Sequence, residues 1–312
     1  MLDAGDIKLE NPLLSLSNHL AATVEQAGSA VVGINSHARS AASGVHWRPG
    51  VIVTAEHALR RDDEIRVTTA AGEELKAELA GRDPGTDLAV LKIAGFDAPI
   101  ATIAAGGALS AGSLALALGR SRVNGLTASL GIVSSTGGPW QTWRGGRLER
   151  YIRLDLSVYP GAAGGAVIDA SGQTIGIATV ALSRTSPIAI PAETVNRVAD
   201  SLLAHGTVPR GFIGVGLQPV AIPDHLKTKL NLDHATGLIV VSVQPGGPAE
   251  QGGVMIGDIL LDLAGKQVND TDGVQEALDS GSVGKTVPAR VIRAGELVGL
   301  EITVGQRSRR SC

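Results

Sequence analysis

Short runs of β-branched and other apolar residues dominate the first two thirds of this chain. Each run is cut off by Gly, Pro or Asp, and the runs lie at 29–34, 43–47, 51–55, 65–69, 87–93, 112–118, 126–133, 151–157, 165–169, 174–181 and 187–190. Runs of this length between turn residues are typical of β-strands. So many short strands predict a mostly β protein, built as a pair of barrels or as a sandwich.

The composition supports this fold class and excludes several functions. The 312 residues include 41 Gly but only three Trp, two Tyr and two Phe, which indicates many tight turns around an aliphatic core. With 27 Lys and Arg against 30 Asp and Glu, the net charge of -3 does not favour nucleic acid as a partner. Cys312 is the only cysteine, so neither an internal disulfide nor a Cys-ligated zinc site is expected. No metal or cofactor site is predicted.

The pattern along the chain divides it into two domains with a leading helix. Asn11-Pro12 followed by leucines at helical spacing predicts an N-terminal helical segment within 1–28. The β-rich stretch and a closing helix make a first domain, and a second set of strands with short helices near 248–252 and 271–280 makes another. The expected divisions are 1–28, 29–206, 210–306 and a polar tail, 307–312.

No apolar run is long enough to span a bilayer, and the N-terminus carries acids where a signal peptide needs basic residues. The chain is therefore expected to be either cytosolic or trimmed of its targeting segment.

Three segments carry residues with chemical potential. His57 ends the apolar run Val51–Leu59, Asp87 heads the run that ends at Ile93, and a turn of small residues, Gly161–Gly165, precedes another strand. Taken singly, each has a structural explanation: a hydrogen-bonded histidine, a capping aspartate and a sharp backbone bend.

Together, the order and context of these three motifs resemble the HtrA family of trypsin-like serine proteases, over about residues 29 to 304. The resemblance implies a trypsin-like double β-barrel protease domain followed by a PDZ domain of α+β type. It makes His57 the general base and Asp87 the residue that orients it, with the turn amides of Gly161, Ala162 and Ala163 forming the oxyanion hole. The implied activity is serine endopeptidase action on unfolded polypeptides in protein quality control, without a cofactor.

Ala163 occupies the position where the family has its nucleophilic serine. A methyl group cannot attack a carbonyl, so the chain as written is expected to be catalytically inactive. Two histories explain this: a natural pseudoprotease that acts as a peptide-binding or chaperone-like scaffold, or an active enzyme inactivated by a Ser-to-Ala change. Because His57 and Asp87 are both present in their family contexts, we favour the second history.

The resemblance also places a specificity pocket and a peptide groove. The pocket would be uncharged and favour aliphatic side chains, and its predicted residues are Ser157, Val158, Thr179, Val180, Ala181 and Ile188. In the PDZ domain, the amides of a loop would receive the carboxylate of a peptide C-terminus, beside a pocket for a terminal Val, Leu or Ala. The predicted groove residues are Phe212, Ile213, Gly214, Val215, Val274, Ala277 and Leu278.

Assembly and location follow from the family alone. HtrA proteins are typically trimers held by N-terminal segments rich in aromatics, but the first aromatic residue here is Trp47. A homo-oligomer is therefore expected without support for a trimer. The family resemblance favours the cell envelope or periplasm if a targeting segment has been removed, and the cytoplasm otherwise.

Overall fold

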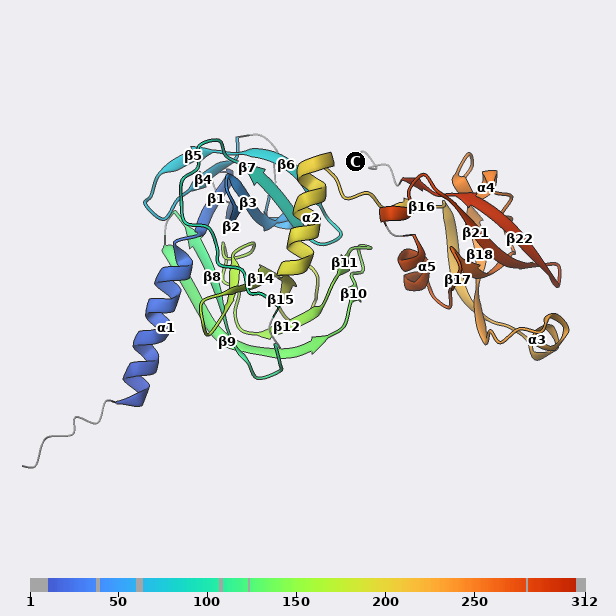
Figure 1. Ribbon diagram of the computed structural model, residues 1–312, viewed down its shortest axis with the longest axis horizontal. Coiled ribbons are helices and arrows are strands. Elements are labelled where there is room, and N and C mark those ends of the chain that lie inside the picture. Colours follow the sequence, from blue (N-terminus) through green and yellow to red (C-terminus); the bar gives the residue numbers. More distant parts are fainter. Residues whose placement is uncertain are drawn as a thin grey trace, which may run out of the picture. The chain divides into compact units, whose positions relative to one another are not determined.

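The chain forms two compact units, Met1–Thr207 and Val208–Cys312 (Figure 1). The structure is a computed structural model, and it describes residues 11–37, 40–59, 64–106, 109–122, 124–278 and 280–306. The predicted tail, 307–312, lies outside the described residues. The mostly β character predicted from the short apolar runs is confirmed, whereas the domain limits at 206 and 210 stay predictions.

The first unit opens with the predicted helix. Helix α1 (Pro12–Gly28) begins after Asn11, whose side chain accepts a hydrogen bond from the Leu13 amide at 3.1 Å. Side-chain capping of a free helical amide is the reason that Asn favours this position. The C-terminal end of α1 packs against Leu126: Gly28 is buried at a site where a side chain would overlap that leucine.

An antiparallel seven-stranded sheet follows α1. Its strands lie in the order β5-β4-β1-β2-β3-β7-β6. Their bounds are β1 (Val31–His37), β2 (Ser40–Arg48), β3 (Val51–Ala55), β4 (Arg66–Thr68), β5 (Glu74–Lys76), β6 (Glu78–Asp83) and β7 (Leu88–Lys92), with the short helix η1 (Glu56–Ala58) after β3. Strands β5 and β6 were missed in the sequence because both are rich in charged residues and form the two edges of the sheet, where one face meets water.

A closed barrel forms the second half of the first unit. Its order is β12-β15-β14-β13-β8-β9, and a small hairpin, β10-β11, extends from it. The bounds are β8 (Leu114–Ser121), β9 (Gly125–Gly137), β10 (Trp140–Gln141), β11 (Arg147–Leu148), β12 (Tyr151–Asp155), β13 (Ala166–Asp169), β14 (Thr174–Thr179) and β15 (Ile188–Pro191). Helix α2 (Ala192–His205) ends the unit and packs on β6, β7 and β14.

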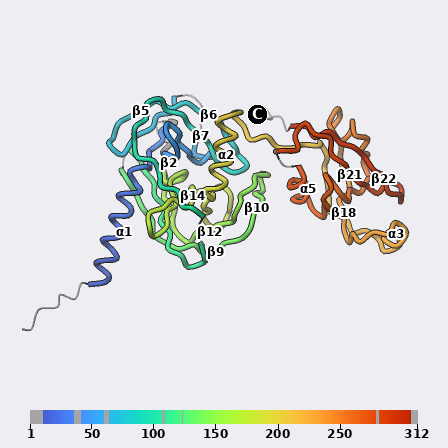
Figure 2. Tube along the Cα trace, in the orientation of Figure 1, coloured from blue at the N-terminus to red at the C-terminus, as the bar shows by residue number. Residues whose placement is uncertain are grey.

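The sheet and the barrel share an interface made by strands that are distant in the sequence. Strand β8 contacts β1 and β2. Figure 2 follows the chain from the sheet into the barrel. Ser43 of β2 donates a hydrogen bond from its hydroxyl to the Gly161 carbonyl at 2.6 Å, and its own amide donates to the Ala163 carbonyl at 3.0 Å. The sheet therefore holds the small-residue turn of the barrel in place.

The second unit is a six-stranded antiparallel sheet with short helices. The strands are β17 (Val215–Ala221), β18 (Thr236–Val243), β19 (Ile259–Leu263), β20 (Lys266–Gln267), β21 (Thr286–Arg293) and β22 (Glu296–Thr303), and a separate pair joins β16 (Gly211–Phe212) to β23 (Gly305–Gln306). The helices are α3 (Asp224–Leu230), α4 (Pro248–Gln251), α5 (Thr271–Ala277) and η2 (Ser280–Ser282). Helix α3 was not predicted, since its seven residues are too few to show a helical period.

Gly164 provides a test of how strongly the turn depends on close packing. Its φ is +84°, and a Cβ there would overlap the Ser43 carbonyl oxygen and Thr54 Oγ1. We expect Gly164→Ala to destabilise the first unit by about 2–4 kcal/mol, because it adds a steric clash to an unfavourable backbone conformation.

Gly72→Ala is the matched control. Gly72 has a φ of +85° but open space around it, so the change should cost only about 1 kcal/mol. Urea unfolding followed by tryptophan fluorescence measures both, because all three Trp lie in the first unit. Equal losses in the two variants would contradict the packing argument.

Candidate functional site

His57 lies in the short helix that directly follows a strand of the sheet. Strand β3 ends at Ala55, and η1 carries the imidazole. Its Nδ1 lies 2.8 Å from Asp87 Oδ2 and 3.0 Å from Asp87 Oδ1, and its backbone amide donates to Oδ1 at 2.9 Å. The His57 side chain is 27% exposed while that of Asp87 is fully buried. The structure thus brings together two residues that lie thirty positions apart in the sequence.

Asp87 receives a further hydrogen bond from the barrel. The hydroxyl of Thr179, at the end of β14, donates to Asp87 Oδ2. Asp87 itself has a φ of +57°, in the left-handed region that aspartate tolerates better than most residues. A buried carboxylate is costly unless donors surround it, and here the His57 amide, the His57 ring and Thr179 do so. With Nδ1 held by Asp87, the other ring nitrogen of His57 is the one that can act as a base.

The hydrogen bond to Asp87 raises the pKa of His57, and this effect exceeds the opposing effect of burial. The charges of Asp87 and Glu56 also raise the pKa, whereas the positive charge of Arg144 lowers it. A raised pKa means that the folded protein holds the His57 proton more tightly than the unfolded chain does. The resulting stabilisation is complete below the unfolded pKa and is lost as the pH rises through the folded pKa.

The turn Gly161–Gly165 presents position 163 at the boundary of sheet and barrel. A Cβ on Gly164 would lie 2.6 Å from the Ala55 amide nitrogen, two residues before His57. Among the described residues, the amides of Gly161 and Ala163 donate no hydrogen bond within the chain. The Ala162 amide donates to the Tyr159 carbonyl at 2.8 Å. It is therefore engaged inside the turn, and only the other two predicted oxyanion-hole amides are available to a ligand.

The predicted specificity residues do not all line one wall. Thr179 is directed at Asp87 and Ile188 is buried in the barrel, while Val180 is 45% exposed. Ser157 is exposed at the start of the loop that leads to the turn, and the partly buried Val158 packs on the barrel core. The Ala181 amide donates to Thr179 Oγ1 at 3.0 Å. Thr179 thus supports the His57–Asp87 pair, a role that no local sequence signal indicates.

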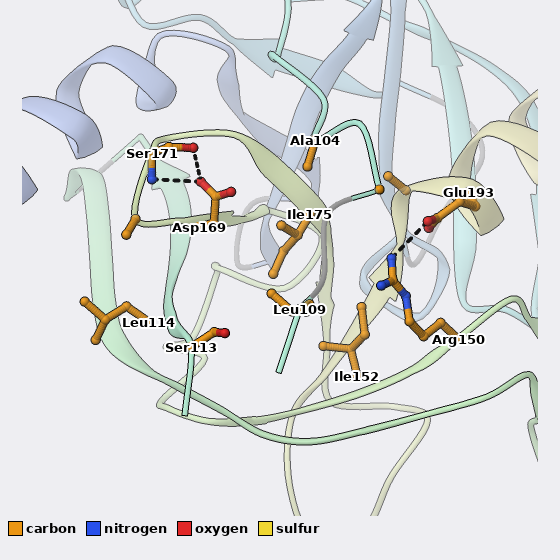
Figure 3. A pocket seen from close by; sticks show the side chains of 13 residues that line it. Ala104, Leu109, Ser113, Leu114, Arg150, Ile152, Asp169, Ser171, Ile175 and Glu193 are labelled. Atoms are coloured by element: carbon orange, nitrogen blue, oxygen red, sulfur yellow. Dashed lines mark hydrogen bonds and ion pairs between the residues drawn. The ribbon is translucent and has the colours of Figure 1, made fainter. Parts of the chain in front are cut away.

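A cavity of about 440 Å³ lies elsewhere in the first unit (Figure 3). Ile152, Ile175 and Leu109 contribute apolar side chains to its lining, and Arg150 pairs with Glu193 at 3.0 Å across its edge. None of the predicted catalytic residues lines this cavity, so it is separate from the site at His57.

The second unit carries the predicted peptide groove beside β17. A cavity of about 120 Å³ is lined by Phe212, Ile213, Gly214, Val215, Val274 and Leu278 from the predicted set, and by Arg210, Gly211, Leu217, Thr271 and Gln275 besides. Ala277, also predicted, belongs instead to the apolar core of the unit. Gly214 has a φ of +78°, and within the described chain the amides of Ile213 and Gly214 donate no hydrogen bond. Adjacent free amides of this kind can bind a carboxylate.

Contact with a carboxylate does not by itself mark a histidine as functional. In the second unit, His234 Nε2 lies 3.4 Å from Asp262 Oδ1, and Arg290 pairs with the same carboxylate at 2.6 Å. Asp262 and Arg290 lie on β19 and β21 and His234 just before β18, whereas the His57 pair lies near a turn in which two amides donate no hydrogen bond within the described chain. Over the residues that the structure describes, no three metal-ligating side chains cluster, and no helix is long and apolar enough to cross a membrane.

Comparison with known proteins agrees with both units. The family model described as "Trypsin-like peptidase domain" matches residues 42–177, and the one described as "PDZ domain" matches residues 211–304. The solved structure of the "HtrA-type protease AlgW with decapeptide" is 30% identical, covers 93% of this chain and 99% of its own, and superposes with a TM-score of 0.78. The chain belongs to the HtrA family.

Proteins from three bacteria are also similar to this chain. The serine endoprotease from Yersinia pestis is 28% identical in sequence, with a TM-score of 0.77 over 92% of this chain and 98% of its own. Proteins named "Probable periplasmic serine endoprotease DegP-like" from Chlamydia trachomatis and Halomonas elongata are each 32% identical. These matches cover 82% and 88% of this chain but 52% and 58% of the relatives, so the chain spans about half the length of these curated proteins.

The pKa of His57 is the direct test of its pairing with Asp87. We expect the imidazole to titrate above the ordinary histidine value of about 6.5, and Asp87→Asn to lower the pKa because it removes both the hydrogen bond and the charge. NMR titration of the histidine ring protons measures both. An unchanged His57 pKa in the variant would contradict the pairing.

Proposed function

We propose that this chain is an HtrA-type endopeptidase of protein quality control whose chemical step is stopped at Ala163, and which in this form binds unfolded polypeptides without cleaving them. The observation that carries the proposal is the geometry at His57. Its Nδ1 is hydrogen-bonded to a buried Asp87, and two amides beside position 163 are free. Base, orienting acid and oxyanion donors are thus present, and only the nucleophile is missing.

Loss of the nucleophile does not remove the capacity to bind. The Ala163 carbonyl accepts a hydrogen bond from Ser43, and the glycines on either side of the turn keep their left-handed conformations. A substrate carbonyl can therefore reach the Gly161 and Ala163 amides, but no covalent intermediate can form. The small remaining acceleration over water lies several orders of magnitude below that of an intact triad.

A second candidate function is a natural pseudoprotease that serves as a peptide-binding scaffold. One observation favours it. Asp87 accepts hydrogen bonds from the His57 backbone amide and from Thr179, so its side chain also joins sheet and barrel. A protein that never cleaved peptides would still need the Asp87 carboxylate to hold sheet and barrel together. The presence of Asp87 is therefore also explained if the chain is a natural pseudoprotease. The codon for residue 163 in the source genome separates the two histories.

The cell envelope is the proposed location. The support is the naming of the DegP-like relatives as periplasmic.

Restoring the nucleophile tests the catalytic part of the proposal. We expect Ala163→Ser to create endopeptidase activity on casein, rising with pH as His57 loses its proton, because the general base must be neutral. Adding His57→Ala should lower that activity by roughly 10⁶-fold, and adding Asp87→Asn by roughly 10⁴-fold. The measurement is release of fluorescent fragments from labelled casein across pH.

A fluorophosphonate probe provides the control for this experiment. It should label the Ala163→Ser variant and leave the original chain unlabelled, because only a hydroxyl at this position can be phosphonylated. A correctly folded Ala163→Ser protein that neither cleaves casein nor takes up the probe would overturn the catalytic assignment and leave the scaffold function.

The peptide groove of the second unit is tested by the form of the peptide terminus. We expect a pentapeptide that ends in Val to bind with a Kd on the order of micromolar as the free acid, and at least about 10-fold more weakly as the amide, because the Ile213 and Gly214 amides recognise a carboxylate. Calorimetry on the full chain measures both forms. Equal affinities would show that the loop is not a carboxylate site.

A further inference from the structure

The hairpin β10-β11 is fastened to the loop that carries Asp87. Thr142 Oγ1 donates to the Gly85 carbonyl at 2.7 Å and accepts from the Gly146 amide at 3.0 Å. Gly146 packs so closely on Gly85 that any side chain there would overlap its carbonyl group. Gly85 lies two residues before Asp87, so these contacts fix the hairpin next to the catalytic pair.

The base of the hairpin is anchored in the barrel. The Trp140 ring meets Tyr151 edge to face, with 5.0 Å between the ring centroids, and Leu148 is fully buried. The tip between these anchors, in contrast, presents its largest side chain to solvent: Trp143 is 72% exposed. The guanidinium of Arg144 stacks on the Trp143 ring, 4.7 Å from its centroid, and Arg144 makes no ion pair within the described chain.

The position of Arg144 relates this tip to the catalytic pair. Its positive charge lies close enough to His57 to lower the pKa of the imidazole. The bond from Thr142 to Gly85 places the hairpin on the Asp87 side of His57. A polypeptide that brings a carbonyl to the Gly161 and Ala163 amides passes His57, and its neighbouring side chains then lie along this wall.

We propose that Trp143 and Arg144 form a binding subsite for a large apolar side chain of the polypeptide held in the cleft, beyond the residue whose carbonyl reaches position 163. Trp and Arg are the side chains most enriched at binding hot spots, and a rigid base keeps the entropy cost of using them low. The Trp143 ring supplies the apolar contact. The unpaired charge of Arg144 favours an acidic neighbour in the ligand and disfavours a basic one.

This inference rests on the proposed function, since it needs a polypeptide in the cleft. It does not depend on the chemical step, because the chain as written binds without cleaving. The probes are acetylated and amidated decapeptides, whose blocked C-terminus removes the PDZ groove as a competing site. Each peptide of the series has a single Leu at a different position, next to either Glu or Lys, and otherwise contains only Ala, Ser and Thr. Binding is measured by fluorescence anisotropy of a label on the peptide.

We expect one Leu position to give the strongest binding, with Glu preferred to Lys beside it. Trp143→Ala should weaken that peptide about 10-fold or more, and Trp143→Phe should retain most of the affinity. The control is Leu130→Ala, which removes a side chain that is 52% exposed on β9 and should leave the affinity unchanged. Tryptophan emission should shift to shorter wavelength on binding, and the shift should disappear with Trp143.

A purely structural role for the hairpin gives a different result in the Ala163→Ser background. As a subsite residue, Trp143→Ala raises KM about 10-fold for the best peptide and leaves kcat unchanged, because no hydrogen bond of the His57–Asp87 pair is removed. Thr142→Val, which removes the bond to Gly85, should instead shift the pH profile through Asp87.

Two outcomes overturn the subsite. In the first, Trp143→Ala changes neither peptide binding by the original chain nor KM in the Ala163→Ser background, although the first protein binds peptide and the second cleaves it. The proposed function then stands without the subsite. The other is a Trp143→Ala variant that lowers kcat and leaves KM unchanged. If the original chain binds no blocked peptide and the Ala163→Ser variant cleaves none, the proposed function fails and the subsite fails with it.

Discussion

A single buried carboxylate joins the two halves of the first unit. Asp87 starts a strand of the sheet, and its oxygens accept hydrogen bonds from the His57 amide and ring on the sheet side and from Thr179 on the barrel side. Fully removed from water, the carboxylate depends on these donors, since an unpaired charge in the interior is far more costly than the bonds are favourable. The orientation of His57 is a consequence of satisfying Asp87.

The turn at position 163 depends on the absence of side chains. Gly164 and Gly165 allow its backbone to lie directly against the sheet and against β8, at distances that no Cβ permits. The amides that remain free in the turn are thereby fixed relative to His57 whether residue 163 carries a hydroxyl or a methyl. In the proposed function, alanine at position 163 therefore stops the chemical step and leaves both the fold and the binding surface in place.

The two units use backbone amides in a similar way. In the first, the amides of Gly161 and Ala163 donate no hydrogen bond within the described chain, and in the second the same holds for Ile213 and Gly214, which line the groove beside β17 and α5. Each pair includes a glycine with positive φ, a conformation that can let neighbouring amides converge on one oxygen. In the functions proposed above, side chains decide selectivity: Val274 and Leu278 in the groove, and the exposed Trp143 with Arg144 near His57.

The sequence by itself determined the mostly β architecture and the N-terminal helix, because apolar periodicity and turn residues are local properties of the chain. It made His57 and Asp87 candidates through the resemblance of three motifs, in their order, to the HtrA family. It also showed that Ala163 cannot be a nucleophile, because the methyl side chain of alanine has no nucleophilic atom. It did not reveal the edge strands β5 and β6, whose charged residues carry no apolar signal, or the short helix α3.

Only the tertiary structure decided which side chains meet. Thr179 was predicted to line a specificity pocket, yet its hydroxyl is directed at Asp87, and Ala277 lies in a core rather than in the peptide groove. The Ala162 amide is engaged by Tyr159, and the hairpin of Trp143 and Arg144 lies beside a loop that is more than fifty residues earlier in the chain. Such contacts arise from the pairing of distant strands, and the spacing of residues along one strand contains no information about the strand that will lie across from it.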